Sequence, residues 1–446
     1  MFKKILIANR GEIAVRVIRA CRELGIKTVA VYSEVDRDSI HTKLADESVC
    51  IGPGPAVESY LSIPNLISAA TITGADAIHP GYGFLAESTY FADVCESCNM
   101  KFIGPSKEAI QKMGDKIQAR KIMEKAGVPP VPGITEKLNP EDPNLYKIVK
   151  KLGYPVMIKA AAGGGGKGIR IVPSEEVLKT AIATAQVEAK ASFGSDDVYL
   201  EKFMESPRHI EFQIAADKKG NACYFPERDC SIQRRYQKLL EESPSPGIDK
   251  DLRKKMGRAA LKAVRAAKYS TVGTVEFLLD KKEHFYFLEM NTRIQVEHTI
   301  TEVITGIDLV KLQIKLAFGE ELKLDSDDIK ICGHAIECRI NAEDINKDFM
   351  PSPGRITDLR LPGGPGVRLD THIYDGYNIP TFYDSLIAKI VVSGDDRAEA
   401  IVRMSRALRE FSIGGVQTTI LLYEKILKNE NFIEGEYYND FIVKHL

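Results

Sequence analysis

Polar side chains recur at every second position of one short segment, EMNTRIQVE at residues 289–297. These positions carry two acids, two amides and a guanidinium: Glu289, Asn291, Arg293, Gln295 and Glu297. Because successive side chains of a strand point to opposite faces, an extended backbone would place all of them on one face. Such a face indicates one wall of a site that handles a metal ion, an anion and a proton together.

The acids of this segment have a partner in the preceding strand. Two apolar runs, residues 274–279 and 285–290, are joined by the charged segment DKKEH. A hairpin with a four-residue loop at residues 281–284 would place Glu276 opposite Glu289, where two carboxylates repel. A divalent cation removes that repulsion, and Asn291 adds a neutral oxygen, a ligand set typical of Mg²⁺ or Mn²⁺. The alternative is a structural ion pair between Glu276 and a lysine.

The second half of the segment suits a small anion. A guanidinium beside a metal can bind a planar anion with two hydrogen bonds, which is the role predicted for Arg293. Glu297 on the same face could remove a proton from that anion. The alternative is a solvated charged loop. The basic run ERDCSIQRRYQK, residues 227–238, precedes two acids and favours a local phosphate or anion site over nucleic acid.

A glycine run, AAAGGGGKGI, lies between two apolar runs near residue 165. A strand–loop–strand with four consecutive glycines offers open backbone N–H groups that can close over an anion. With Lys159 before the loop and Lys167 inside it, the pattern predicts a lid over phosphates, the alternative being a loose turn. It is not a Walker A motif, because GxxxxGK[ST] is missing and a strand follows.

Composition excludes several classes of protein. The 446 residues predict two or three domains, and 61 basic against 62 acidic residues disfavour nucleic-acid binding through bulk charge. No apolar run is long enough to span a bilayer, and the N-terminus does not have the pattern of a signal peptide. The Cys95–Cys98 pair has no second pair to complete a zinc site, so reduced thiols and a cytoplasmic setting are expected.

The elements that must position these residues fall into three parts. Residues 1–114 alternate strands with a helix beginning at Gly11, which predicts a parallel sheet with strands at 5–8, 28–32, 75–79 and 101–103. The turn ANRGEIA lacks GxGxxG, which disfavours a dinucleotide site. Residues 115–330 begin with a helix at 115–126 and contain the glycine loop and the hairpin. Residues 331–446 combine short strands with a helix-rich end, including an amphipathic helix at 396–411.

Taken together, these motifs resemble biotin carboxylase, the ATP-grasp component of biotin-dependent carboxylases, nearly from end to end. The resemblance is carried by IANRGEIAVRVIRAC, IHPGYGFLAE, MGDK, KAAAGGGGKGIR, ERDCSIQRR, FLEMNTRIQVEH, ECRINAED and YDSLIAK. It implies a mixed α/β and α+β fold: a Rossmann-like parallel sheet at 1–114, an ATP-grasp domain at 115–330 with a mobile glycine-rich lid at about 131–203, and a β-rich α+β domain at 331–446.

The resemblance also implies a reaction. MgATP and bicarbonate form carboxyphosphate and ADP, and the CO₂ that carboxyphosphate releases is captured by N1 of biotin. The implied catalytic residues are Lys238, Arg293, Glu297 as the general base, and Arg339 as the stabiliser of the biotin enolate. The implied ATP contacts are Lys116, Lys159, Gly163, Gly164, Gly165, Gly166, Lys167, Gly168, Glu201, Lys202, Phe203, Met204, His209, Gln233 and Leu278. Magnesium or manganese would be held by Glu276, Glu289 and Asn291, bicarbonate by Lys238, Arg293, Gln295 and Val296, and biotin by Tyr82 and Arg339.

The sequence departs from the family pattern at two places. Position 236 is Tyr where some members have His, and Thr299 follows His298 where the family usually has Pro. The chain also lacks an MKM-type biotinylation site, so we expect it to act on a separate biotin carboxyl carrier protein, with a separate carboxyltransferase and as a homodimer. Two rival hypotheses are another ATP-grasp ligase, such as a carbamoyl-phosphate synthetase-like enzyme, and a nucleotide-binding module without catalysis.

Overall fold

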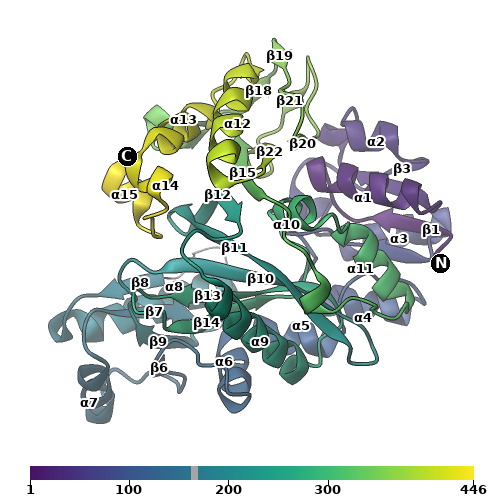
Figure 1. The fold of residues 1–446 in the computed structure, drawn as a ribbon. Coiled ribbons are helices and arrows are strands. Elements are labelled where there is room, and N and C mark those ends of the chain that lie inside the picture. The colour runs from purple at the N-terminus through teal and green to yellow at the C-terminus, as the bar shows by residue number, and fades with distance from the viewer. Residues whose placement is uncertain (162–168) are drawn as a thin grey trace.

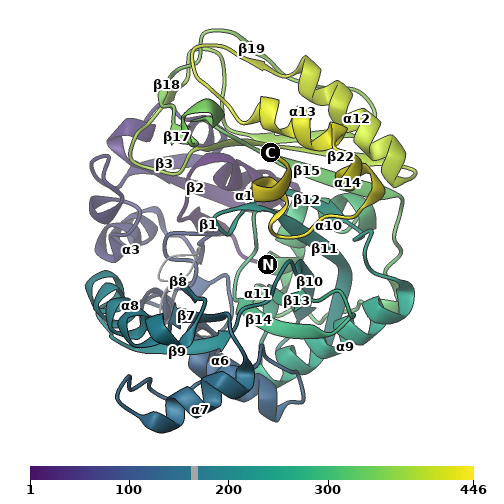
Figure 2. The same cartoon turned by 90° about the vertical axis from the view of Figure 1, so that its left-hand side faces the viewer.

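The computed structural model describes residues 1–161 and 169–446 (Figure 1). Within these ranges the chain forms sheets of five, eight and four strands and three two-stranded sheets. In both views the four-stranded sheet lies in the lower part of the molecule and most of the C-terminal part lies in the upper part (Figure 2). No helix in this part of the chain is long and apolar enough to cross a membrane.

The N-terminal part is the predicted parallel sheet, in the order β3-β2-β1-β4-β5. Its strands are β1 (Lys4–Ile7), β2 (Lys27–Tyr32), β3 (Glu47–Cys50), β4 (Ala77–His79) and β5 (Lys101–Phe102). Its helices are α1 (Gly11–Glu23), α2 (Ile40–Leu44), α3 (Ile63–Thr73), α4 (Thr89–Ser97) and α5 (Lys107–Gly114). The four predicted strands are confirmed. The edge strand β3 escaped prediction because its short sequence, ESVC, has almost no buried side chain.

Helix α1 is buried on nearly all sides. Ile13, Val17 and Cys21 are buried at the spacing of one helical face, and the charged side chains of Glu12 and Arg16 are buried as well. The helix packs on the N-terminal sheet and also contacts β20 (Val367–Thr371) and β22 (Leu386–Gly394), which belong to the C-terminal part. Charged residues of α1 therefore lie inside the molecule, between its N-terminal and C-terminal parts.

A small antiparallel sheet in the order β6-β9-β7-β8 forms a unit with its own core. It comprises β6 (Gly133–Ile134), α7 (Pro143–Leu152), β7 (Val156–Ala160), β8 (Ile169–Val172), α8 (Leu178–Phe193) and β9 (Val198–Lys202). We call these elements the small sheet unit. The predicted strand–loop–strand is confirmed as β7 and β8, while the glycine run from Gly163 to Gly168 with Lys167 lies outside the described residues.

An eight-stranded sheet joins the middle of the chain to its C-terminal part, in the order β14-β13-β10-β11-β12-β15-β22-β20. Its remaining strands are β10 (Arg208–Ala216), β11 (Ala222–Arg234), β12 (Gln237–Ser243), β13 (Thr271–Leu279), β14 (Phe285–Asn291) and β15 (His334–Asn341). β12 pairs with β15, so one sheet runs across the predicted boundary at residue 330. The domain boundaries themselves stay a prediction.

Helices cover this sheet and complete the C-terminal part. The predicted helices at 115–126 and 396–411 are confirmed as α6 (Lys116–Lys125) and α12 (Arg397–Glu410). α12 buries Ala400, Met404, Ala407 and Leu408, the spacing of one helical face. The other helices here are α9 (Lys250–Ala267), α10 (His298–Thr305), α11 (Leu309–Phe318), α13 (Ile420–Lys428), α14 (Glu430–Glu434) and α15 (Phe441–His445). The two-stranded sheets pair β16 (Glu343–Asp344) with β17 (Met350–Pro351), β18 (Gly354–Arg355) with β21 (Asn378–Ile379), and β19 (Leu359–Arg360) with β23 (Ser412–Ile413).

Candidate active site

One cleft of about 700 Å³ lies between the N-terminal sheet, the small sheet unit and the eight-stranded sheet. It brings together every described residue that was predicted for the site: Tyr82, Lys116, Lys159, Glu201, Lys202, Phe203, Met204, His209, Gln233, Lys238, Glu276, Leu278, Glu289, Asn291, Arg293, Gln295, Val296, Glu297 and Arg339. These residues come from positions as far apart as 82 and 339, so only the folded chain makes them neighbours.

The predicted acid pair is present at the floor of the cleft. Glu276 on β13 and Glu289 on β14 are direct partners in the antiparallel register. The connection differs from the prediction: the N–H of Asp280 donates to the carbonyl of His284, leaving a tighter turn at 281–283. An irregularity between Glu276 and Phe277 then shifts the register by one residue, so the two acids still face each other.

The pair is asymmetric in charge. Burial raises the pKa of Glu276, but Lys238 and His209 outweigh it and hold that pKa well below its usual range. Burial and the neighbouring Glu276 raise the pKa of Glu289, for which no hydrogen bond or ion pair is found among the described residues. The ion pair with a lysine, which was the alternative to metal binding, is thus present for Glu276, whose Oε1 lies 2.9 Å from Lys238 Nζ. Glu289, facing another acid, remains suited to a divalent cation.

Asn291 completes this oxygen-rich corner. Its amide nitrogen donates to Glu276 Oε1 at 2.8 Å, and its carbonyl oxygen accepts from Arg293 Nη2 at 3.0 Å. These contacts keep the amide oxygen beside the acid pair, and oxygen donors of this kind are those that Mg²⁺ prefers. The donor set therefore fits magnesium or manganese.

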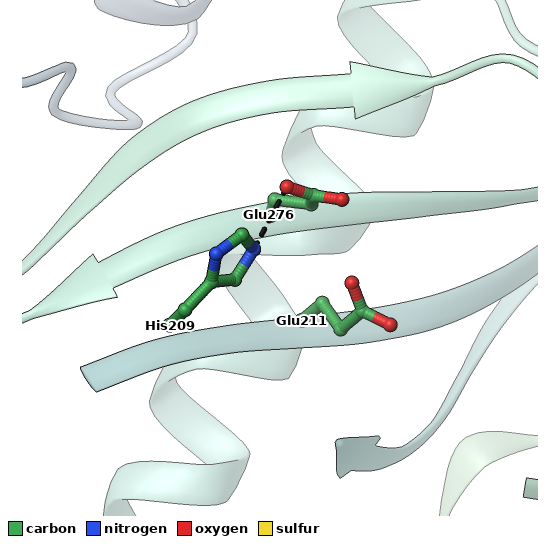
Figure 3. Close-up of side chains that lie close together, drawn as sticks. All are labelled: His209, Glu211 and Glu276. Atoms are coloured by element: carbon green, nitrogen blue, oxygen red, sulfur yellow. Dashed lines mark ion pairs between the residues drawn. The ribbon is translucent and has the colours of Figure 1, made fainter. Parts of the chain in front are cut away.

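His209 and Glu211 on β10 lie against Glu276 (Figure 3). His209 Nε2 lies 2.8 Å from Glu276 Oε2, and one ligand atom of each of the three residues lies within 4.8 Å of the others. Glu211 is nevertheless bound to Arg228 and Lys238, both at 2.5 Å, so its charge is already compensated. Metal binding accordingly favours Glu276 with Glu289 over this second group, because Glu289 has no such partner among the described residues.

The predicted single extended face does not continue past Asn291, where β14 ends. Residues 292–297 form an irregular turn because α10 begins at His298, and the backbone must redirect from strand to helix. Within this turn Ile294 is fully buried, while the neighbouring polar side chains still reach the cleft. The prediction of one strand for 289–297 is thus wrong, although the side chains of Glu289, Asn291, Arg293, Gln295 and Glu297 all line the one cleft.

Lys238 on β12 is the centre of the charged network. Its Nζ donates to Glu211 Oε2 at 2.5 Å, Glu276 Oε1 at 2.9 Å and Glu297 Oε1 at 2.7 Å. Burial lowers the pKa of this ammonium, but the three carboxylates outweigh it and hold the pKa well above its ordinary value. Lys238 is therefore a fixed positive charge between the acid pair and Glu297.

Glu297, just before α10, is flanked by two cations. Lys238 bonds one of its oxygens, and Arg339 Nη2 donates to the other at 2.9 Å. Burial raises its pKa, but Lys238, Arg339 and Arg228 together hold it well below its usual range. An anion bound here would share these two cations, and the pKa of Glu297 would rise toward that of a useful base.

Arg293 and Gln295 are held by residues that were not predicted from the sequence. Arg293 Nε donates to Glu87 Oε2 at 2.9 Å, and Gln295 accepts from Arg228 Nη2 at 2.6 Å. Gln295 also donates to Glu276 Oε1 at 2.7 Å. Glu211 could have been recognised, because the apolar strand RHIEFQIAA carries a polar residue at every second position, the same signal as at 289–297. Glu87 sits on a loop and carries no such periodicity.

The nucleotide side of the cleft is built on α6 and the small sheet unit. The Lys159 ammonium and Arg120 Nη1 both contact the buried carboxylate of Glu201. Lys116, at the start of α6, makes no ion pair with the described residues, and burial lowers the pKa of its ammonium. This places a cation without a carboxylate partner at the wall where a phosphate is expected.

At the end of β9 and just after it, two backbone N–H groups already make hydrogen bonds within the protein. The N–H of Lys202 donates to Pro132 and that of Phe203 to Pro155, while Lys202 Nζ donates to the carbonyls of Gly153 and Tyr154. The side chain of Lys202 therefore holds the turn before β7. Met204 and Leu278, which also line the cleft, offer apolar surface beside Gln233, whose amide lies 2.8 Å from His209 Nδ1.

The remaining end of the cleft combines Tyr82 with Arg339. The Tyr82 hydroxyl donates to Glu12, and Lys389 Nζ contacts that same carboxylate at 3.1 Å and the carbonyl of Val296 at 2.8 Å. Lys389 is fully buried, so it ties α1 to the turn that carries Glu297. Neither Glu12 nor Lys389 was predicted, because each lies in a segment that has the pattern of core.

The fold and this site define a class: an ATP-grasp ligase, with a nucleotide side, an oxygen-rich acid pair and an anion site in one cleft. Three family models match in succession: the biotin carboxylase N-terminal domain at residues 1–110, the carbamoyl-phosphate synthase L chain ATP-binding domain at 115–325, and the biotin carboxylase C-terminal domain at 337–444. The chain belongs to the biotin carboxylase family.

Comparisons with individual relatives support this family assignment. A biotin carboxylase of Nostoc sp. is 57% identical over 99% of this chain and 98% of its own length, and a biotin carboxylase of Bacillus subtilis is 56% identical over 99% and 98%. A crystal structure of biotin carboxylase from Campylobacter jejuni superimposes with a TM-score of 0.96 at 48% identity, covering 100% of this chain and 99% of that one. The biotin carboxylase domain of Hydrogenobacter thermophilus 2-oxoglutarate carboxylase, solved as a dimer with MgADP and bicarbonate, gives a TM-score of 0.95 at 48% identity, covering 100% and 98%.

Proposed function

We infer that this chain carboxylates N1 of biotin, using MgATP and bicarbonate, with carboxyphosphate as the intermediate. The observation that carries the proposal is the position of Glu297. It lies between Lys238 and Arg339, in the same cleft as the acid pair and the lysines of the nucleotide side. A base, an anion site and a phosphate site within one cleft are what a phosphoryl transfer to bicarbonate requires.

The nucleotide is held on one side of the cleft. Lys116 and Lys159 bind its phosphates, Glu201 to Met204 with Leu278 form the base site, and His209 and Gln233 lie beside the sugar. We assign the glycine run from Gly163 to Gly168 and Lys167 to the part that closes over the phosphates. Glu276, Glu289 and Asn291 hold Mg²⁺ or Mn²⁺, which when bound offsets the charge of the transferring phosphoryl group.

Bicarbonate is a weak nucleophile that must be oriented and deprotonated. Arg293, Gln295, the backbone of Val296 and Lys238 orient it, and orientation can lower such a barrier by about 7–11 kcal/mol. Glu297 takes its proton as a bicarbonate oxygen forms a bond to the γ-phosphorus and the bond to ADP breaks. Carboxyphosphate then separates into CO₂ and phosphate. A positioned base accounts for about 10²–10⁴-fold in rate.

Biotin completes the reaction at the other end of the cleft. N1 loses its proton to the phosphate released from carboxyphosphate and forms a bond to CO₂. The ureido oxygen gains negative charge when N1 is deprotonated, and the guanidinium of Arg339, always charged, stabilises that oxygen. Tyr82 lies beside the ring. We further propose that the biotin is attached to a separate carrier protein, that a carboxyltransferase uses the product, and that the chain works as a homodimer in the cytoplasm, with neither nucleic acid nor membrane as partner.

The test uses the purified chain with ATP, Mg²⁺, labelled bicarbonate and free biotin. Labelled carboxybiotin, formed together with ADP, is the expected product. Arg339→Ala should keep part of the bicarbonate-dependent ATP hydrolysis and lose biotin carboxylation. ATP hydrolysis that requires bicarbonate and ignores biotin in the wild type would instead support another ATP-grasp ligase.

A further inference from the structure

Arg339 is held from two sides by carboxylates. On the cleft side its Nη2 lies 2.9 Å from Glu297 Oε2, and on the far side its Nε and Nη2 both lie 2.6 Å from Glu241 Oε1. Glu241, on β12, is fully buried and is not among the residues that line the cleft. One carboxylate is therefore exposed to the reaction and the other is shielded from it.

The backbone of Arg339 is fixed independently of these contacts. Its carbonyl accepts hydrogen bonds from the hydroxyls of Thr419, at 3.1 Å, and Tyr423. The residue also lies within β15, which is paired on both sides. Only the direction of the guanidinium is left for the two carboxylates to determine.

A second buried acid lies next to Glu241. Glu337 on β15 is its direct partner across the β12–β15 ladder, and no cation bonds it in the described part of the chain. Its Oε2 accepts instead from the hydroxyl of Thr299, the residue that replaces the usual proline. Two facing buried carboxylates cannot both carry a charge without a large cost, so one of them is neutral.

Geometry decides which acid takes the proton. Glu241 faces Arg339, and Glu337 faces only a hydroxyl. Burial raises the pKa of both acids. A direct bond from Arg339 opposes the rise of the Glu241 pKa, whereas Lys389, which opposes the rise of the Glu337 pKa, pairs with Glu12 instead. The proton thus resides on Glu337, and Glu241 keeps the negative charge.

We propose that Glu241 is a positioning residue for Arg339, and that neutral Glu337 behind it lets Glu241 hold the guanidinium toward biotin throughout the cycle. The inference rests on the proposed function. When Glu297 takes the proton of bicarbonate, it loses its charge and its hold on Arg339. A buried guanidinium without a counter-charge is strongly destabilised, and Glu241 remains as that counter-charge. Its contacts with Nε and Nη2 hold one edge of the guanidinium and leave Nη1 without a hydrogen bond among the described residues.

The experiment compares two activities of the full chain: ATP hydrolysis dependent on bicarbonate alone, and carboxylation of free biotin. Glu241→Gln should lower kcat for biotin carboxylation by up to about 10²-fold, because Arg339 is no longer aimed, with little change in KM for biotin. Its biotin-independent ATP hydrolysis should remain close to wild type. Glu241→Asp, which keeps the charge on a shorter side chain, should recover part of the loss.

Two neighbours serve as controls. Glu337→Gln copies the neutral form and should keep both activities. Glu242→Gln alters the adjacent buried acid, which contacts His334 and Arg397 instead of Arg339, and should change both activities in the same proportion. Thermal melting checks that each variant folds, and if Glu241→Gln does not fold, the same selective loss in Glu241→Asp decides the question.

Equal loss of both activities in the Glu241 variants, or unchanged biotin carboxylation, would overturn the proposal. Loss of biotin carboxylation in Glu337→Gln would overturn the assignment of the proton. A wild-type chain that hydrolyses ATP but never carboxylates biotin would refute the proposed function instead, so the two failures can be told apart.

Discussion

The two sides of the cleft are prepared for catalysis in different ways. On the floor, formed by β10–β14 and the turn at 292–297, the charges other than that of Glu289 are already matched: Lys238 bonds three carboxylates, and Arg228 bonds Glu211 and Gln295. On the nucleotide side, Lys116 has no carboxylate partner among the described residues, and the small sheet unit has a core of its own. The floor is preorganised, whereas the nucleotide side is electrostatically complete only with a phosphate bound.

This difference has a chemical reason. Bicarbonate is small and offers little binding energy, so the groups that orient and deprotonate it must be held by the protein itself. A nucleotide is large, and its binding can supply the energy that orders the groups around it. Substitutions of the floor residues that orient or deprotonate bicarbonate should therefore affect the rate of chemistry, and substitutions on the nucleotide side should affect nucleotide affinity.

The largest expected effect is at Glu297. Glu297→Gln removes the only carboxylate between Lys238 and Arg339 that faces the cleft among the described residues, and carboxybiotin formation should fall by about 10²–10⁴-fold. MgATP affinity, measured by calorimetry, should stay near the wild-type value. Glu283→Gln, in the exposed turn of the hairpin, is the matched control. A variant that still forms carboxybiotin at the wild-type rate would remove Glu297 from the role of base.

The next effect separates metal binding from proton transfer. Glu289→Gln should raise the Mg²⁺ concentration for half-maximal rate by roughly 10–100-fold or more, because even partners outside the ligand sphere cost this much. Saturating Mg²⁺ should recover most of the rate, in contrast to Glu297→Gln. Chelation of the metal by EDTA should abolish ATP hydrolysis. If the Mg²⁺ dependence stays that of the wild type, Glu289 is not a ligand.

A pH effect is expected from Lys116. Burial lowers the pKa of this ammonium, and only its protonated form attracts phosphate. ATP affinity should therefore weaken as pH rises, beginning below the pH at which an ordinary lysine loses its proton. Lys116→Arg, which stays charged, should remove this dependence while leaving the pH profile of the floor residues in place. An unchanged pH dependence of KM for ATP in that variant would assign the effect to another group.

The smallest effect concerns stability. Ile158 is fully buried in the core of the small sheet unit, and Ile210 is fully buried under the floor. Each Ile→Val change should cost about 0.5–1.5 kcal/mol. Hydrogen exchange should speed up in β7 and β9 for Ile158→Val and in β10 and β13 for Ile210→Val. Faster exchange in both regions for both variants would show that the two sides unfold as one unit.

Much of the floor could be predicted from the sequence because it follows the period of a strand. The alternation at 289–291 and the apolar runs around it predicted the hairpin and the facing acids. The turn was predicted one residue too long, and the irregularity beside Glu276 compensated for it. Hydrophobic patterns specify which face is buried, but a bulge leaves no signal in them.

The site residues that were not predicted from the sequence were missed for one physical reason. Glu12, Glu241, Glu337 and Lys389 lie in segments that bury most of their neighbours, and their role depends on partners far away in the chain. Lys389, for example, meets Glu12 across 377 positions of sequence, the difference between 389 and 12. Only the packing of α1 against the C-terminal strands brings these charges together, and no local pattern reports that packing.

The most direct test of the central claim follows oxygen atoms. If a bicarbonate oxygen attacks the γ-phosphorus, that oxygen stays with phosphate when carboxyphosphate releases CO₂. Turnover with ¹⁸O-labelled bicarbonate, ATP, Mg²⁺ and biotin should therefore give phosphate carrying one labelled oxygen per carboxybiotin formed. Unlabelled phosphate would show that water attacks ATP, and would contradict the account of this cleft.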